Sequence, residues 1–259
     1  MQTSFFEAGG PHRYLATQAT QGPWVPGAQH GGPPSALAAR ELELHEPDAN
    51  MRLARVAVDI LRPVPVGLLT ATTRTIRPGK RVALLETILQ SDGRDVLIAR
   101  GWRTALMPDS PAVSISGEAP GEPPETEQPP VFPGAEMDGY LTHIEWRFSA
   151  GGFAEPGPCT AWGRPRVPLL PGEDFSPMAR SLLLADSGNG LSMVLDPRAY
   201  LFVNVDLTVL LHRDPAGEWL RLDSVSSMGP TGTGLAETQL ADTSGVVGTG
   251  VQTLLISPR

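Results

Sequence analysis

The feature that most constrains the fold of this 259-residue chain is a succession of predicted elements that occurs twice. In each half, one helix-forming segment precedes four runs of strand-forming residues, and turns that contain glycine separate several of these runs. Short strands joined by such turns are typical of antiparallel sheets. A helix followed by a meander, repeated in the same order, therefore predicts a duplicated α+β unit.

The elements expected in one half correspond to those expected in the other. The first half has a predicted helix over 33–45 and predicted strands over 53–61, 68–76, 82–91 and 96–106. The second half has a predicted helix over 177–186 and predicted strands over 199–212, 219–227, 234–241 and 246–256. Both helices are apolar on most faces, so each is expected to be buried against its own sheet. A helix wrapped by a curved antiparallel sheet is the hotdog arrangement, and two in one chain predict a double hotdog.

A segment rich in proline and glutamate separates the two halves. Residues 108–138 contain no lysine or arginine and too few large apolar side chains to form a core. We therefore expect an N-terminal hotdog repeat over 1–107, a solvated linker over 108–138 and a C-terminal hotdog repeat over 139–259.

The composition excludes several classes of function. A net charge of −8 and the lack of a lysine- or arginine-rich run argue against a nucleic-acid partner. No apolar run approaches the roughly 18 residues of a membrane span. No motif for a cofactor or a metal is found, and the single cysteine, Cys159, is expected to be a small buried or loop residue. With no disulfide framework and no signal-peptide pattern, the expected location is the cytoplasm.

The stretch Gln29–Arg40 (QHGGPPSALAAR) places two glycines and two prolines at the entrance of the first predicted helix. Unpaired N–H groups and the positive end of the helix dipole favour a negatively charged oxygen there, and glycine lets that oxygen approach. We therefore predict an oxyanion and substrate-binding site at Gly31 and Gly32, with His30 beside it. The alternative is a plain junction between a loop and a helix.

Several motifs together resemble one known family. They are Gly31-Gly32, Ile60–Pro63 (ILRP), Val205-Asp206, His212-Arg213, Glu218–Leu220 (EWL), Asp223–Ser227 and Val251-Gln252. Their order and spacing in the second half are similar to those of the acyl-CoA thioesterase II family. This resemblance implies a double hotdog fold, an acyl-CoA substrate and assembly into a homo-oligomer.

The resemblance also implies a catalytic trio. In that family an Asp, a hydroxyl residue and a Gln activate the water that attacks the thioester, and here they correspond to Asp206, Ser227 and Gln252. The family usually has Thr at the position of Ser227, and Ser226 is the competing candidate. An Asp in the middle of a strand is unusual, which independently makes Asp206 a candidate general base.

Two further acidic residues are expected to be structural. Asp59 occupies the place in the first half that Asp206 occupies in the second, and we expect it to pair with Arg55 or Arg62. Asp186 ends the second predicted helix, where a role in capping or in lining the pocket is expected.

The predicted activity is hydrolysis of acyl-CoA by direct attack of water, without a covalent intermediate. A hotdog hydratase or dehydratase is the first alternative, although no His follows Asp186 as that chemistry usually requires. A non-catalytic module that binds acyl thioesters is the second alternative.

Overall fold

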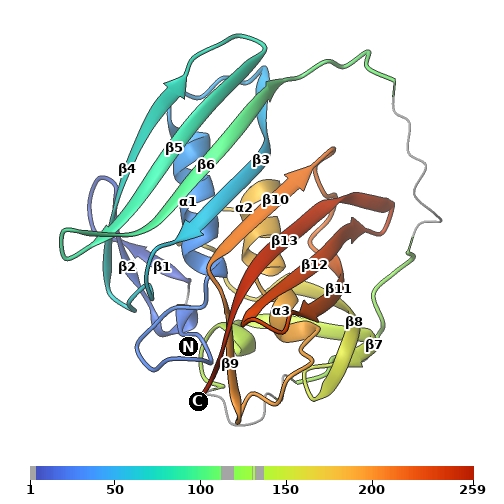
Figure 1. Cartoon of the computed structure of the whole chain (residues 1–259). Coiled ribbons are helices and arrows are strands. Elements are labelled where there is room, and N and C mark those ends of the chain that lie inside the picture. The colour runs from blue at the N-terminus through green and yellow to red at the C-terminus, as the bar shows by residue number, and fades with distance from the viewer. Residues whose placement is uncertain (1–3, 112–119, 130, 132–136) are drawn as a thin grey trace.

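The computed structural model describes residues 4–111, 120–129, 131 and 137–259 (Figure 1). Its strands form one 13-stranded sheet in which all paired strands are antiparallel. The sheet curves around two helices, α1 (Gly32–Leu44) and α2 (Pro177–Ala185), which lie side by side within it (Figure 1).

The first half begins with two short strands and contains α1 between the second and third. Its strands are β1 (Phe6–Ala8), β2 (Arg13–Ala16), β3 (Met51–Ile60), β4 (Leu68–Arg77), β5 (Val82–Ser91) and β6 (Arg94–Ala105). A 3₁₀ turn, Gln18–Thr20, follows β2. In space the strand order is β1-β2-β4-β5-β6-β3.

The second half has the same order of elements with a few additions. Its strands are β7 (Ile144–Gly152), β8 (Glu155–Pro165), β9 (Tyr200–Asn204), β10 (Asp206–Leu211), β11 (Leu220–Met228), β12 (Thr233–Asp242) and β13 (Gly245–Pro258). A 3₁₀ turn, Tyr140–His143, precedes β7, and a short helix, α3 (Gly188–Leu191), follows α2. The strand order is β7-β8-β11-β12-β13-β10, with β9 paired to β13. The two halves therefore have equivalent connectivity.

The edge strands β3 and β10 join the two halves. They pair antiparallel, and Asp59 of β3 lies directly opposite Asp206 of β10. The expected ion pair of Asp59 with Arg55 or Arg62 is not found among the described residues, so that expectation is corrected.

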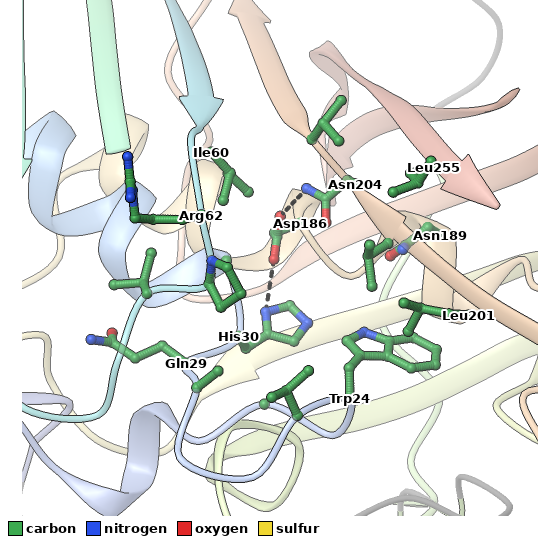
Figure 2. A pocket seen from close by; sticks show the side chains of 18 of the residues that line it. Trp24, Gln29, His30, Ile60, Arg62, Asp186, Asn189, Leu201, Asn204 and Leu255 are labelled. Atoms are coloured by element: carbon green, nitrogen blue, oxygen red, sulfur yellow. Dashed lines mark hydrogen bonds and ion pairs between the residues drawn. The ribbon is translucent and has the colours of Figure 1, made fainter. Parts of the chain in front are cut away.

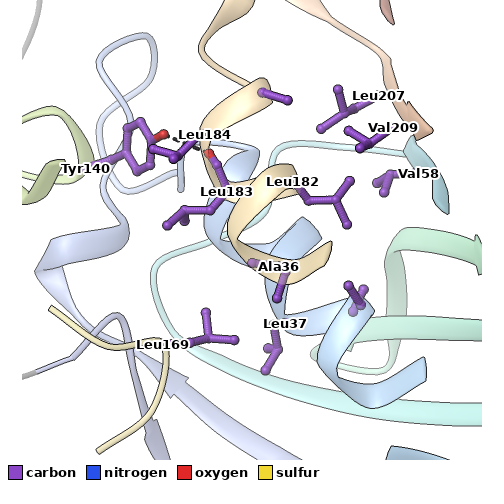
Figure 3. Close-up of a cluster of buried hydrophobic side chains, with 14 of the residues drawn as sticks. Ala36, Leu37, Val58, Tyr140, Leu169, Leu182, Leu183, Leu184, Leu207 and Val209 are labelled. Atoms are coloured by element: carbon purple, nitrogen blue, oxygen red, sulfur yellow. Dashed lines mark hydrogen bonds between the residues drawn. The ribbon is translucent and has the colours of Figure 1, made fainter. Parts of the chain in front are cut away.

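The two helices pack into an apolar core on the concave side of the curved sheet. Figure 3 shows Ala36 and Leu37 of α1 close to Leu182 and Leu183 of α2, with Val209 of β10 nearby. Each of these side chains is fully buried, and burying one leucine stabilises a fold by roughly 1.5–3 kcal/mol. The expectation that both helices are buried is confirmed.

Side chains satisfy polar groups at the N-terminal end of α2 and at the C-terminal end of α1. Ser176 caps α2, because its hydroxyl accepts a hydrogen bond from the N–H of Ala179 at 3.1 Å. Arg103 of β6 donates to carbonyl groups at the C-terminal end of α1, including those of Glu43 and His45. Such partners replace the intrahelical bonds that the terminal groups lack.

The helices and most strands lie where the sequence predicted them. β1, β2, β7 and β8 were missed, because they are short or contain prolines and glycines that weaken a strand pattern. The predicted strand over 199–212 is interrupted at Val205. Within the described residues of the expected linker there is no helix or strand.

Cys159 is buried, as expected, and burial raises the pKa of its thiol to about 12. No helix of the described residues combines the length and the apolar composition that a membrane span requires.

Candidate active site

A cavity of about 380 Å³ lies where the two halves meet (Figure 2). Its walls come from the loop before α1, the segment after β3, the C-terminal end of α2, and β9. Most of the lining is apolar and includes Trp24, Val25, Ala28, Ile60, Leu61, Val64, Leu201, Val203, Val205 and Leu255. An apolar cavity with a few convergent polar groups is the usual form of a small-molecule site.

The polar centre of this cavity is the carboxylate of Asp186, the C-cap residue of α2. Asp186 is 2% exposed, and one of its oxygens, Oδ2, lies 2.8 Å from Nδ1 of His30. Its other oxygen, Oδ1, accepts a hydrogen bond of 2.8 Å from Nδ2 of Asn204 on β9. A buried carboxylate at the negative end of a helix dipole needs such donors. Asp186, for which the sequence suggested a structural role in capping or in lining the pocket, thus lines the cavity, and sequence reasoning missed its partners His30 and Asn204.

The imidazole of His30 is held by its contacts on two sides. Its ring stacks on Tyr140, with centroids 3.8 Å apart and planes inclined by 12°. The hydroxyl of Tyr140 donates to the carbonyl of Leu183 at 2.7 Å, and burial raises the pKa of Tyr140. Because Nδ1 of His30 faces the Asp186 carboxylate, the favoured tautomer donates from Nδ1. Its Nε2 is then free to act as a base, and Figure 2 shows this atom on the side away from Asp186.

The two glycines explain how the helix ends approach each other. A Cβ on Gly31 would lie 2.8 Å from both carboxylate oxygens of Asp186. A Cβ on Gly32 would collide with the backbone carbonyl of Leu183 in α2. Glycine at both positions therefore lets the N-terminal end of α1 contact the C-terminal end of α2.

The same turn presents backbone donors at the site. Pro33 and Pro34 have no N–H, so Gly31 and Gly32 supply the donors of this helix entrance. The N–H of Gly31 has no acceptor among the described residues, and the nitrogen of Gly32 lies 3.2 Å from Nδ1 of His30. Because the N–H of Gly32 is directed at the imidazole of His30, the N–H of Gly31, which lines the cavity, is the donor that this turn offers to a bound molecule.

Gln252 lies beneath this site on the inner face of β13 and is 2% exposed. Its Nε2 donates to the backbone carbonyl of Asp186 at 3.1 Å, and its Oε1 accepts the N–H of Asn189 at 3.2 Å. Gln252 therefore fixes the turn between α2 and α3, which places it with Asp186 rather than with Asp206.

Asp206 lies on the opposite, outer face of the sheet. Its carboxylate accepts a hydrogen bond from the N–H of Thr253 at 2.5 Å and another from the hydroxyl of Thr253 at 3.2 Å. Because residues alternate faces along a strand, Thr253 points outward while its neighbour Gln252 points inward. The expectation that Asp206 and Gln252 bind the same water is corrected by this arrangement.

A β-bulge at Val205 is the physical reason for the correction. Before it, Asn204 pairs with Leu254 of β13, whereas after it Thr208 pairs with Val251, so β9–β10 contains one extra residue. Such an insertion reverses the alternation of side chains beyond it. Without the bulge, Asp206 would share the inner face with Asn204.

Ser227 also lies outside the site. It is exposed on the outer face of β11, opposite Leu235 of β12. Its neighbour Ser226 points inward, is 8% exposed and hydrogen-bonds Ser192 at 2.8 Å. The structure therefore does not bring Asp206, Ser227 and Gln252 together, whereas it does bring His30, Gly31 and Gly32 to one place.

The lining residues that were not selected from the sequence include Asn204, Gln29 and Trp24. The sequence did contain an indication that Asn204 has a functional role, because Asn, like Asp, is uncommon within a strand. A signal for the importance of Asp186 was its position after a helix of apolar residues, followed at once by Ser-Gly-Asn-Gly.

Two family models match the chain over most of its length. The model described as the acyl-CoA thioesterase N-terminal domain matches residues 20–104, and the acyl-CoA thioesterase C-terminal domain matches residues 118–256. A search of curated protein sequences gave no match.

Solved structures resemble the whole chain at low sequence identity. A protein assigned as a thioesterase II from Thermobifida fusca YX is 19% identical, with a TM-score of 0.77 over 97% of this chain and 95% of that chain. A protein assigned as a thioesterase from Novosphingobium aromaticivorans DSM 12444 is 21% identical, with a TM-score of 0.73 over 97% of this chain and 98% of that chain. A hotdog-fold protein of Alicyclobacillus acidocaldarius is 14% identical, with a TM-score of 0.76 over 97% of this chain and 95% of that chain.

These similarities establish the fold as that of the hotdog proteins, and the two family models define the class as a hotdog-fold thioesterase. The chain belongs to the acyl-CoA thioesterase family, because the C-terminal model alone matches more than half of it. The chain is accordingly a thioester hydrolase, and the resemblance seen in its motifs is confirmed.

Proposed function

We propose that the chain hydrolyses acyl-CoA by direct attack of water, and that His30, Asp186 and the N–H of Gly31 perform the chemistry. The observation that carries this proposal is the buried pair of His30 and Asp186, 2.8 Å apart, at the wall of an apolar cavity. Membership of the acyl-CoA thioesterase family supports the substrate class.

The first step is the activation of water. Nε2 of His30 accepts a proton from the water as the water oxygen forms a bond to the thioester carbon. Asp186 orients the ring through Nδ1–H and stabilises the imidazolium that results, while Asn204 holds the carboxylate in place. A positioned general base of this kind accelerates a reaction by about 10²–10⁴-fold.

The second requirement is stabilisation of the carbonyl oxygen as it becomes negative. The N–H of Gly31 provides a donor at this helix entrance, and the positive end of the α1 dipole favours the negative charge there. One such donor typically contributes about 10²–10³-fold in rate.

The tetrahedral intermediate then collapses. Its C–S bond breaks, and the proton on Nε2 of His30 passes to the departing thiolate, which gives a free acid and the CoA thiol. No acyl-enzyme forms, and Gln252 acts as a positioning residue that keeps Asp186 at the end of α2.

The equivalent strand order of the two halves supports a finer description of the fold. We infer two tandem hotdog repeats, over 1–107 and 139–259, connected by the segment 108–138. The cytoplasmic location and the homo-oligomer stay predictions from the sequence.

The test compares Asp206, which the sequence made the candidate general base, with Asp186, which lies beside His30 in the structure. Asp186→Asn is expected to lower kcat/KM for acyl-CoA hydrolysis by about 10²–10⁴-fold, measured as release of free thiol. Asp206→Asn is the matched control and is expected to retain near wild-type turnover. The reverse result, with loss only in Asp206→Asn, would restore the trio predicted from the sequence and refute the site proposed here.

A hydratase is the second candidate, because the structure supplies the Asp–His pair that the local sequence lacks. His30 reaches Asp186 from the other half of the chain. Incubation with a 2-enoyl-CoA separates the reactions, since hydration removes the enoyl absorbance without releasing thiol. Thiol release at constant enoyl content supports the hydrolase.

A further inference from the structure

We propose that Tyr140 is a positioning residue that acts through His30, because the face of its ring stabilises the imidazolium that forms when His30 accepts the proton of the attacking water. This inference rests on the proposed function and deepens it. It gives the stack of the two rings an electrostatic role besides that of holding the imidazole in place.

The two rings lie face to face, which is not the arrangement that two neutral aromatic side chains prefer. Their centroids are 3.8 Å apart and their planes are inclined by 12°. Neutral aromatic pairs prefer an offset or edge-to-face contact with centroids about 4.5–7 Å apart. The contact of Phe5 with Tyr140 follows this preference, with centroids 6.3 Å apart and planes inclined by 38°. So does the contact of Trp24 with Phe202, at 4.9 Å and 72°.

A face-to-face contact at this distance is favourable when one of the two rings carries a positive charge. The face of a phenol ring is negative and attracts a cation that lies over it within about 6 Å of the centroid. The imidazolium of His30 meets this condition, whereas the neutral imidazole gains no such attraction. The attraction is strongest where water is excluded, and here Tyr140 is 0% exposed and His30 is 7% exposed.

The phenol of Tyr140 keeps its proton, as this role requires. Burial raises the pKa of Tyr140, and its hydroxyl donates to the carbonyl of Leu183 at 2.7 Å (Figure 3). The phenol oxygen also lies 2.9 Å from the hydroxyl of Ser187, which then acts as the donor. Leu183 and Ser187 lie on either side of Asp186 in the chain. The side chain of Tyr140 therefore contacts both the base and the turn that carries its carboxylate partner.

Backbone hydrogen bonds fix the two rings against each other, although they come from different halves of the chain. The N–H of His30 donates to the carbonyl of Thr20 at 2.8 Å. The N–H of Tyr140 donates to the carbonyl of the next residue, Gln21, at 2.9 Å. A Cβ on Gly139 would collide with that same carbonyl, so glycine before Tyr140 permits the approach. The stack is thus held by the backbone and not by the two side chains alone.

Asp186 is the charged group that lies against the imidazole of His30. Its carboxylate contacts Nδ1 at the edge of the ring, whereas Tyr140 covers a face. Arg62 is the remaining charged residue that lines the cavity, and its Nε donates to the carbonyl of Asp95 at 2.9 Å. The carboxylate and the phenol ring therefore act in the same direction, since both favour the protonated form of His30.

The experiment reverses the charge distribution of the ring and keeps its shape. Tyr140→Phe is the reference, and a second protein carries pentafluorophenylalanine at position 140, whose ring face is positive. The fluorinated ring is expected to lower kcat for acyl-CoA hydrolysis by about tenfold relative to Tyr140→Phe. KM is expected to stay the same, because Tyr140 does not line the cavity.

The profile of kcat against pH distinguishes this role from a purely structural one. An imidazolium that lies over a positive ring face loses its proton more readily. The acidic limb of the profile is therefore expected to move to lower pH by about one unit with the fluorinated ring, which is the equivalent of a tenfold change. Monofluorinated and difluorinated phenylalanine at position 140 are expected to give intermediate values, so the result does not depend on the folding of one protein.

The control makes the same exchange at Phe175, which packs edge-on against Phe5 with centroids 6.3 Å apart. Pentafluorophenylalanine at that position is expected to leave kcat and the pH profile as in the wild type. Equal kcat values and equal profiles for phenylalanine and its fluorinated forms at position 140 would overturn the inference. A lower kcat without movement of the acidic limb would also overturn it, because the ring would then only fill space.

Failure of the proposed function has a different signature. If no protein releases thiol, or if His30→Ala retains turnover, an NMR titration of the ring protons of His30 becomes the readout, with His30→Ala to assign them. A midpoint about one pH unit lower with pentafluorophenylalanine than with phenylalanine at position 140 would retain the stabilised imidazolium without the proposed hydrolysis. Equal midpoints would overturn the inference.

Discussion

The imidazole of His30 and the carboxylate of Asp186 lie 2.8 Å apart although 156 positions separate them in the chain (186 − 30). His30 precedes α1 in the first half, and Asp186 ends α2 in the second. Neither half alone contains the pair, so the proposed activity depends on the packing of the two helices against each other. The close approach of their ends, which Gly31 and Gly32 permit, thereby becomes part of the site.

The first prediction concerns the division of roles in this pair. If His30 is the base and Asp186 acts through it, the two residues form one unit, and their substitutions are not additive. His30→Ala and Asp186→Asn are each expected to lower kcat by about 10²-fold or more, and the double variant is expected to be little worse than either. The measurement is steady-state thiol release from acyl-CoA.

Added imidazole provides the control. It is expected to restore part of the activity of His30→Ala, because it can occupy the space of the missing ring, and to leave Asp186→Asn unchanged. Additive losses without any rescue would show that Asp186 removes the proton itself.

The second prediction separates the two glycines. In Gly31→Ala the new methyl would contact the end of the Asp186 side chain, which can shift, so we expect kcat to fall by about 10²-fold with a small loss of stability. In Gly32→Ala the methyl would meet the carbonyl of Leu183 inside α2, which cannot move alone. We expect that variant to lose about 1–3 kcal/mol of unfolding free energy.

Thermal melting and kcat are measured together on both variants. Gly67→Ala is a suitable control, since no atom would lie within 4 Å of its Cβ. A Gly31→Ala protein with wild-type kcat would disprove the close contact with Asp186.

The fold was largely predictable because its signals are local. Amphipathic alternation and glycine turns located β3–β6 and β11–β13 from short windows of sequence. The bulge at Val205 is not a local signal, since it arises from the simultaneous pairing of this segment with β13 and β3. That one extra residue determines the face on which Asp206 lies.

The residues of the proposed site were selected from the sequence in one half of the chain and not in the other. His30, Gly31 and Gly32 were selected because a helix entrance with unpaired N–H groups is recognisable from the sequence. Asp186 was set aside because its partner, His30, is remote in sequence, and only the packing of α1 on α2 reveals the pair. The family resemblance pointed to Gln252, which does contact Asp186, but through the backbone carbonyl.

The third prediction concerns stability at low pH. Burial opposes the charged form of Asp242, but hydrogen bonds from Arg213 and from the N–H groups of Ala216 and Ser244 outweigh it and lower the pKa of Asp242 to about 2. A carboxyl whose pKa is lowered by folding stabilises the protein above its unfolded pKa of about 3.9. This contribution is lost as the pH falls from about 4 towards 2.

Urea unfolding at about pH 5 and about pH 3 tests this linkage. The free energy of unfolding of the wild type is expected to fall by about 1 kcal/mol more than that of Asp242→Asn, which has no proton to bind at this position. Other carboxyl groups titrate in both proteins, so the difference isolates Asp242. Equal decreases in the two proteins would mean that Asp242 is not stabilised as a carboxylate.

The last prediction concerns the length of the acyl chain. Trp24 lines both the main cavity and a second cavity of about 10 Å³, whose other walls include Leu141 and Phe153. The indole therefore forms part of the wall between the main cavity and a small apolar space, together with His30 and Asn189, which also line both. Trp24→Ala is expected to join the two cavities and to bury about two more methylene groups of a long acyl chain. At about 0.8 kcal/mol for each methylene, this raises the ratio of kcat/KM for dodecanoyl-CoA to that for hexanoyl-CoA by about tenfold.

Trp219→Ala is the matched control for this change. Its indole stacks between Arg147 and Arg164, at 4.6 and 4.7 Å from their guanidinium carbons, and it does not line either cavity. Loss of that ring is expected to lower the melting temperature without altering the ratio between chain lengths. If Trp24→Ala lowered kcat/KM equally for every chain length, the indole would position the thioester rather than end the acyl pocket.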